Sequence, residues 1–195
     1  MKMADNIRLT GIERFIEGDE IIVTKTDLKG KLTYANDVFR RISHVSEAEC
    51  LGQPHSLIRH PDMPRCIFQM LWDHLQNGQE IFAYVVNRAL NGDHYWVHAH
   101  VTPSFDESGQ IIGYHSNRRL ANKETLTNTI IPLYKKLLQE EQRHANRKNG
   151  MKASLQMIQD MLSEQGVEYD EFICNLSNQS MTAPTYEPVA KTANG

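Results

Sequence analysis

A proline-rich turn holds the side chains of this chain that are best suited to binding a ligand. Between Gly52 and Pro64 the sequence reads GQPHSLIRHPDMP, which contains three prolines. Because proline fixes its own φ and lacks a backbone N–H, this run is not expected to form a long regular helix. Arg59, His60 and Asp62 lie between the prolines and offer two potential cations and one anion. The pattern predicts a rigid ligand-binding loop; the alternative is an exposed loop whose charges only face water.

Further motifs, read together with this turn, resemble a known family. Phe68 and Trp72 follow the turn, Asn87 comes next, and the string NGDHYWV occupies residues 91–97. These strings are similar to the PAS domain of bacterial aerotaxis transducers, and the resemblance runs over about residues 21–119, roughly half of the chain. The HPDMP and NGDHYWV strings are long and unusual, which makes the resemblance specific. It implies a domain that binds FAD and senses redox state or oxygen without catalysing a reaction on a substrate.

The chemistry of FAD matches the side chains in these motifs. Arg59 can pair with the anionic phosphates or with the electron-rich edge of the flavin. Asn36 and Asn87 each offer a donor and an acceptor, which suits a ring edge that carries both. Phe68 and Trp72 can wall a cavity, although an aromatic stripe on a helix more often belongs to an ordinary core. By resemblance, the cofactor-contacting positions of the family match Asn36, Arg59, His60, Asp62, Trp72, Asn87 and Tyr95, all compatible with that role.

His115 marks a departure from the family pattern. Aerotaxis-type domains carry an apolar methionine at the matching position of the last strand, next to the reactive edge of the flavin. A histidine there would donate to flavin N5 and titrate near neutral pH. The alternative is an imidazole bonded to the sheet or to a neighbouring side chain. We include His115 among the candidate cofactor-binding residues.

Photochemistry and metal binding are weaker interpretations of the same sequence. Light-sensing flavin PAS domains need a reactive cysteine where this chain has Pro54-His55, so photoadduct chemistry is not expected. His94, His98 and His100 share one face of a predicted strand, and a metal site there is conceivable. No carboxylate or cysteine accompanies them on that strand, so we predict no metal site.

Two other functions remain as alternatives to a flavin sensor. A haem-binding PAS domain would take an axial histidine from the long helix, where His74 is the candidate. A cofactor-free interaction module is the second alternative, because PAS folds host many ligands. The sequence shows no nucleophile–base pair and no phosphate-binding glycine loop, so we do not expect an enzyme.

Composition places the chain among globular proteins of the cytoplasm. It has 195 residues, of which 40% are hydrophobic, enough for one domain with an appendage. A net charge of −3 gives no basic surface for nucleic acid. The sequence has no apolar run of membrane-spanning length and no signal-peptide pattern at its start. Its three cysteines follow no motif, which fits a reduced, cytoplasmic protein.

The pattern up to residue 120 predicts an α+β PAS fold, a five-stranded antiparallel sheet with short helices on one face. β-Branched residues and turn signals predict strands over residues 20–26, 31–35, 81–90, 94–105 and 110–119. Capping residues and helical periodicity predict helices over residues 37–43, after Ser46, and over residues 65–76.

Period-2 alternation assigns the faces of the last three strands. One face mixes small and polar residues, as a ligand cavity needs: Ala83, Val85, Asn87, Tyr95, Val97, Ala99, Val101, Gly113, His115 and Asn117. The other face carries Phe82, Tyr84, Val86, His94, Trp96, His98, His100, Ile112 and Tyr114. This second face is too aromatic for bare solvent, so we expect an N-terminal helix, the C-terminal helices or a second subunit to cover it.

The segments outside the PAS domain, which we place at residues 20–120, have other roles. The spacing of Ile12, Phe15 and Ile16 predicts a short amphipathic helix in an N-terminal cap, residues 1–19. Apolar periodicity predicts a C-terminal helical output region at residues 121–176, and composition predicts a disordered tail at 177–195. Whole aerotaxis transducers continue into a membrane anchor and a signalling coiled coil, which this sequence lacks. We therefore expect the signal to pass to a partner protein of unknown identity or through a homodimer.

Overall fold

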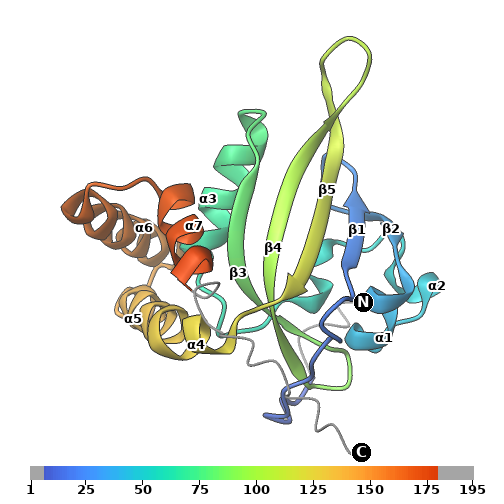
Figure 1. Cartoon of the computed structure of the whole chain (residues 1–195), viewed down its shortest axis with the longest axis horizontal. Helices are drawn as coiled ribbons and strands as arrows, with labels where there is room; N and C mark the ends of the chain where they lie inside the picture. Colours follow the sequence, from blue (N-terminus) through green and yellow to red (C-terminus); the bar gives the residue numbers. More distant parts are fainter. Residues whose placement is uncertain (1–6, 180–195) are drawn as a thin grey trace, which may run out of the picture.

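A single antiparallel sheet forms the centre of the computed structural model, which describes residues 7–179 (Figure 1). Its strands are β1 (Ile22–Thr26), β2 (Leu32–Ala35), β3 (Ile81–Arg88), β4 (His94–Phe105) and β5 (Ile111–Leu120). They lie in the order β2-β1-β5-β4-β3, so the first hairpin of the chain pairs with its last strand. The predicted five-stranded antiparallel sheet is confirmed.

Short helices fill the long connection between β2 and β3. They are α1 (Asp37–Ser43), α2 (Glu47–Cys50), the 3₁₀ helix η1 (His55–Ile58) and α3 (Arg65–Gln76). Local capping sets the first two helices, as predicted: the Asn36 side chain accepts from the N–H of Phe39, and Ser46 with Glu49 forms a capping box. The prolines of the turn leave only the single 3₁₀ turn η1 before α3 begins, which matches the expectation for that run.

The faces of β3 and β4 alternate as predicted. Asn87 and Ala99 line a cavity beneath α3, whereas Tyr84 and Trp96 lie on the opposite face. Tyr134 from the C-terminal helices donates its hydroxyl to the backbone oxygen of Tyr84 at 2.6 Å, and its ring lies 6.0 Å from that of Trp96. The aromatic outer face of these two strands is therefore covered by the C-terminal helices, one of the three coverings we considered.

The predicted faces of β5 are wrong. Ala99, on the cavity side of β4, pairs with Arg118, and residues directly opposite across two strands share a face. Tyr114 lies on that same face and meets the ring of Trp72 edge-on, with centroids 5.3 Å apart. The residues of β5 that face α3 are therefore Tyr114, Ser116 and Arg118, rather than Gly113, His115 and Asn117. The prediction failed because alternation within one strand does not show which of its faces turns inward, and that is set here by the pairing of β5 with β4.

The chain after β5 forms a layer of helices beside β3 (Figure 1). They are α4 (Lys123–Thr125), the π-helix η2 (Leu126–Ile130), α5 (Ile131–Gln142), α6 (Arg147–Gln165) and α7 (Tyr169–Gln179). Of the predicted disordered tail, residues 177–179 belong to α7, and residues 180–195 lie outside the described residues. Within residues 7–179 no helix combines the length and apolar character needed to span a bilayer.

The predicted amphipathic helix near the N-terminus is wrong. The segment instead runs extended beside the start of β4, where Arg14 N donates to His94 O at 2.7 Å and His94 N donates to Ile12 O at 2.9 Å. Asp93 fixes it further, by accepting from Thr10 Oγ1 and from Arg14 Nε, both at 2.6 Å. These contacts stabilise the extended segment more than helix formation would, because a short helix is only marginally stable by itself.

Candidate functional site

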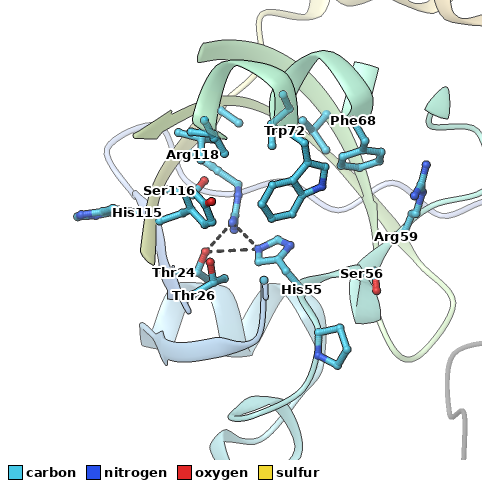
Figure 2. A pocket seen from close by; sticks show the side chains of 18 of the residues that line it. Thr24, Thr26, His55, Ser56, Arg59, Phe68, Trp72, His115, Ser116 and Arg118 are labelled. Carbon is cyan, nitrogen blue, oxygen red and sulfur yellow. Dashed lines mark hydrogen bonds between the residues drawn. The ribbon is translucent and has the colours of Figure 1, made fainter. Parts of the chain in front are cut away.

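A cavity of about 280 Å³ lies between α3 and the inner face of the sheet (Figure 2). The wall that α3 supplies is apolar and is made of Phe68, Leu71, Trp72 and Leu75. These side chains form the predicted stripe of the helix, and the amphipathic spacing of α3 turns it toward the sheet. The opposite wall comes from the sheet and η1, and its polar groups lie on β1, β3, β5 and η1. The cavity therefore joins a flat aromatic surface to a set of hydrogen-bonding groups.

Arg118 of β5 is the central polar group of the cavity. Its side chain is only 4% exposed, and Nη2 donates to Thr24 Oγ1 and to His55 Nε2, both at 2.6 Å (Figure 2). Burial lowers the pKa of Arg118 to about 10, which still leaves the guanidinium charged at neutral pH. None of the ion pairs formed within residues 7–179 involves it. A buried positive charge without a carboxylate thus borders the cavity, an arrangement that is unfavourable unless a ligand compensates it.

His55 acts as an acceptor for this guanidinium. Burial, together with the positive charge of Arg118, lowers the pKa of His55 well below its ordinary value. The ring is therefore neutral, and since Nε2 accepts from Arg118, its proton lies on Nδ1. Thr24 Oγ1 lies 3.4 Å from the same Nε2, so the three side chains form one closed cluster.

Three buried polar atoms on the cavity wall have no hydrogen-bond partner in the described part of the chain. They are Asn87 Nδ2, Ser116 Oγ and Arg118 Nη1. Buried polar groups in folded proteins are nearly always hydrogen-bonded, and leaving one unpaired costs about 1–3 kcal/mol. Three such groups around a single cavity indicate a ligand that accepts hydrogen bonds from them.

Arg59 provides a second cation at the far end of the cavity. It follows η1, and its guanidinium carbon lies 4.2 Å from the ring centroid of Phe68. Figure 2 shows its side chain beside Phe68, pointing away from the cluster around Arg118. Within residues 7–179 no carboxylate forms an ion pair with it. Its position is suited to an anionic group that extends out of the cavity.

The structure brings five of the nine predicted cofactor residues to this cavity. They are Arg59, Phe68, Trp72, Asn87 and His115. His115 differs from the other four, because its imidazole points away from the cavity (Figure 2). Its Nε2 lies 3.2 Å from Asn117 Oδ1, which is the alternative partner we considered, a neighbouring side chain. His115 therefore borders the site without presenting its ring to a ligand.

Asn36 and Tyr95 are not brought to the cavity. The Asn36 side chain accepts from the backbone N–H groups of Val23 and Phe39, so it joins β1 to the start of α1. Tyr95 is buried, and its hydroxyl lies 2.7 Å from Ser43 Oγ. Both side chains thus hold α1 against the sheet.

His60 and Asp62 also lie outside the cavity. His60 is buried against the ring of His94, with centroids 5.6 Å apart, and its Nδ1 accepts from the backbone N–H of Asp62. The Asp62 side chain is mostly exposed and lines a separate cavity of about 360 Å³ beside Trp96 and α5. Of the three predicted residues on this turn, only Arg59 lines the cavity.

Sequence reasoning missed the residues Thr24, His55, Ser116 and Arg118. The available signal was in β5, where serine and arginine alternate with histidine and asparagine, so both faces of the strand are polar. A strand between two neighbours in a packed sheet rarely carries charge on its inner side unless that charge has a partner or a role. Ala99, the residue opposite Arg118 on β4, has a small side chain.

The alternative chemistries find less support around this cavity. His74, the candidate haem ligand, does not line it, and its Nδ1 lies 2.8 Å from the backbone oxygen of Met70. Within residues 7–179 no group of three histidine, cysteine, aspartate or glutamate side chains is arranged to hold a metal ion. Cys50 and Cys66 are buried, and burial raises the pKa of both thiols, that of Cys66 to about 11.

Comparison with known proteins shows that part of the chain is similar to a known family. The profile of a family described as "PAS fold" matches residues 32–118. The aerotaxis receptor of Escherichia coli (strain K12) is 43% identical over 119 residues, covering 61% of this chain and 23% of the receptor. The nitrogen fixation regulatory protein of Klebsiella pneumoniae is 28% identical over 127 residues, covering 60% of this chain and 26% of that protein. The chain thus spans about a quarter of the length of these curated relatives.

Solved structures with a similar arrangement include two at low sequence identity. The PAS domain of a protein from Colwellia psychrerythraea has a TM-score of 0.49 and 19% identity, covering 53% of this chain and 87% of that one. The dark structure of the blue-light photoreceptor Aureochrome1 LOV has a TM-score of 0.48 and 21% identity, covering 63% and 84%. The family profile covers β2, most of β5 and the elements between them, so these residues have the PAS fold, and the chain is similar to part of the aerotaxis receptor.

Proposed function

We propose that this PAS domain binds FAD in its cavity and serves as a non-catalytic redox or oxygen sensor. The observation that carries the proposal is the set of three unpartnered polar atoms, Asn87 Nδ2, Ser116 Oγ and Arg118 Nη1, around one cavity. A flavin ring is flat, and its pyrimidine edge accepts hydrogen bonds, so it complements both this polar wall and the aromatic wall opposite. The buried charge of Arg118 favours the electron-rich edge over a purely apolar ligand.

Different residues of the cavity would bind different parts of the cofactor. Asn87, Ser116 and Arg118 would donate to the ring edge, and Trp72 would lie against the ring. The cavity, at about 280 Å³, is slightly smaller than the usual range of ligand pockets, roughly 300–1,000 Å³. It suits the ring system, while the phosphates would lie outside, against Arg59. When bound, a flavin supplies reversible electron transfer.

We propose further that the signal leaves through the C-terminal helices to a protein partner, in energy taxis or a related pathway. β5 carries Ser116 and Arg118 and runs directly into α4, η2 and α5, so a change at the cavity wall reaches the helices without crossing another element. The similarity to an aerotaxis receptor and to a nitrogen fixation regulatory protein supports a role in bacterial signalling. The unpaired thiols of Cys50 and Cys66 are consistent with a cytoplasmic location.

Absorbance of the purified protein tests the cofactor directly. We expect two bands, in the blue and near ultraviolet, and release of FAD on denaturation, identified by chromatography against FMN and riboflavin. A strong Soret band would contradict the proposal and favour a haem sensor. A protein that stays colourless after incubation with excess FAD would contradict it as well, and would favour a cofactor-free interaction module.

A further inference from the structure

The first turn of α3 depends on a side chain from another part of the molecule. Its N-cap residue is Pro64, whose side chain makes no capping hydrogen bond. The first N–H groups of any α-helix have no partner within the helix, so they need one from outside. Here the carboxylate of Glu141, near the end of α5, accepts from Arg65 N at 2.7 Å and from Cys66 N at 3.1 Å. A carboxylate at this end of a helix is also favoured by the helix dipole.

The same carboxylate joins α6 to this contact. Ser154 of α6 is fully buried and donates its hydroxyl to the same oxygen of Glu141 at 3.1 Å. α5 and α6 approach closely nearby, since a Cβ added at Gly150 would lie 2.4 Å from the backbone oxygen of Glu141. α6 also packs on α3. The two helices therefore form one tight hairpin, and Glu141 is its polar connection to α3.

α3 and Glu141 are both connected to the cavity. The helix that Glu141 caps carries Phe68 and Trp72, the aromatic wall described above. Arg59, which lies over Phe68, is close enough to Glu141 for their charges to interact: burial and the charge of Arg65 lower the pKa of Arg59, and Glu141 opposes both. Arg59 lies over Phe68 of the same helix whose first turn Glu141 caps, so the cation and the carboxylate both contact α3.

We propose that Glu141 is a latch: its carboxylate holds the α5–α6 hairpin against the start of α3, and an anionic ligand group at Arg59 weakens that hold. The negative charge of such a group repels the carboxylate and draws Arg59 toward the ligand. Loss of the carboxylate leaves the first N–H groups of α3 without this acceptor and breaks the contact from Ser154, whose hydroxyl keeps the backbone oxygen of Met151 as an acceptor at 3.0 Å. The coupling rests on the proposed FAD site, whereas the capping contact itself does not.

Amide hydrogen exchange, followed by NMR on the full chain, tests the latch. In Glu141→Ala the amides of Arg65, Cys66 and residues 131–165 are expected to exchange at least about tenfold faster than in the parent protein. The matched control is Glu140→Ala, one position away on α5, where the carboxylate contacts Arg143 and His144 rather than α3. Equal exchange in the two variants would overturn the latch, whatever the cavity binds.

FAD binding tests the coupling. Because coupling between two sites is reciprocal, a variant with a released hairpin must bind the ligand more tightly if the ligand releases the hairpin. We expect Glu141→Gln, which keeps the shape and removes the charge, to bind FAD about fivefold more tightly or better, with no change in Glu140→Gln. In the parent protein, added FAD should speed exchange over residues 131–165.

The outcomes separate the two proposals. If FAD binds equally to both variants and leaves exchange unchanged, the coupling is overturned while the flavin site stands. If no form of the protein binds FAD, the proposed cofactor and the coupling both fall, and the exchange comparison still decides whether Glu141 holds the hairpin.

Discussion

The two ends of the cavity hold cations in contrasting surroundings. At the inner end, Arg118 is 4% exposed, bonded to two neutral partners and left with one nitrogen unpaired. At the outer end, Arg59 is half-buried, lies over an aromatic ring and turns away from the cavity (Figure 2). Charges interact more strongly in the protein interior than in water. The inner charge can therefore act strongly on a desolvated ligand atom, whereas the outer charge is screened by solvent and salt. The contrast points to a ligand with a polar ring edge inside and a charged group outside.

Replacing Arg118 should give the largest effect and should separate binding from stability. In Arg118→Met we expect FAD affinity to fall by more than about 100-fold, because a charged hydrogen bond to a buried edge is lost. The cofactor-free protein should become more stable, since a buried charge without a carboxylate is replaced by an apolar side chain of similar length. Titration with FAD and thermal unfolding measure the two quantities.

The neighbouring residue provides the control for this experiment. Arg119 is exposed and lies on the other face of β5, so Arg119→Met should change neither affinity nor stability appreciably. Equal losses of FAD affinity in the two variants would show that Arg118 acts through the general charge of the domain. A less stable Arg118→Met protein would contradict the view that its charge is uncompensated.

Replacing Arg59 should give the next largest effect. Arg59→Ala is expected to lose about ten- to hundredfold in FAD affinity while the fold persists, because a hydrogen bond to a charged group contributes about 1.5–3 kcal/mol. Since this contact is partly exposed, FAD affinity of the parent protein should decrease as salt is added. That salt dependence should be weaker in Arg59→Ala. A variant with full flavin content and an unchanged salt dependence would remove Arg59 from the site.

Lowering the pH should reduce the stability of the folded protein through His55, which lies at the inner end of the cavity. Its pKa is lowered in the folded protein, so below its ordinary value near 6.5 the unfolded chain binds a proton that the folded protein does not. The stability that His55 contributes is therefore complete above about pH 6.5 and declines as the pH falls below it, by up to about 1.4 kcal/mol per pH unit.

The comparison of His55→Gln with the parent protein isolates this group. The pKa values of His60 and His98 are lowered too, so the parent should lose stability more steeply than the variant while both show a residual slope. Chemical denaturation at several values between pH 7 and pH 5 measures the two slopes. Parallel curves would mean that His55 is already protonated in the fold.

Local patterns predicted the parts of the site that depend on one element alone. Trp72 and Phe68 repeat with the helical period, and Asn87 alternates along a strand, so their faces followed from the sequence. Arg118 was missed because its inward direction depends on its pairing with Ala99 of β4 and on its bonds to Thr24 and His55, which come from distant segments. The N-terminal segment was mispredicted for the same reason, since its extended path depends on bonds to Asp93.

We expect the smallest effect from replacing His115. Its neighbour Ser116 provides the comparison, because replacing Ser116 should weaken FAD binding more. His115 and Ser116 are neighbours on opposite faces of β5, and only Ser116 presents an unpaired atom to the cavity. Ser116→Ala should weaken FAD binding by about fivefold, the equivalent of one neutral hydrogen bond. His115→Met should stay within about twofold of the parent protein, with unchanged flavin absorbance between pH 6 and pH 8. If His115→Met shifts the flavin bands or the affinity more than Ser116→Ala does, β5 presents its other face to the ligand, and the assignment of Arg118 to the inner end of the cavity is lost with it.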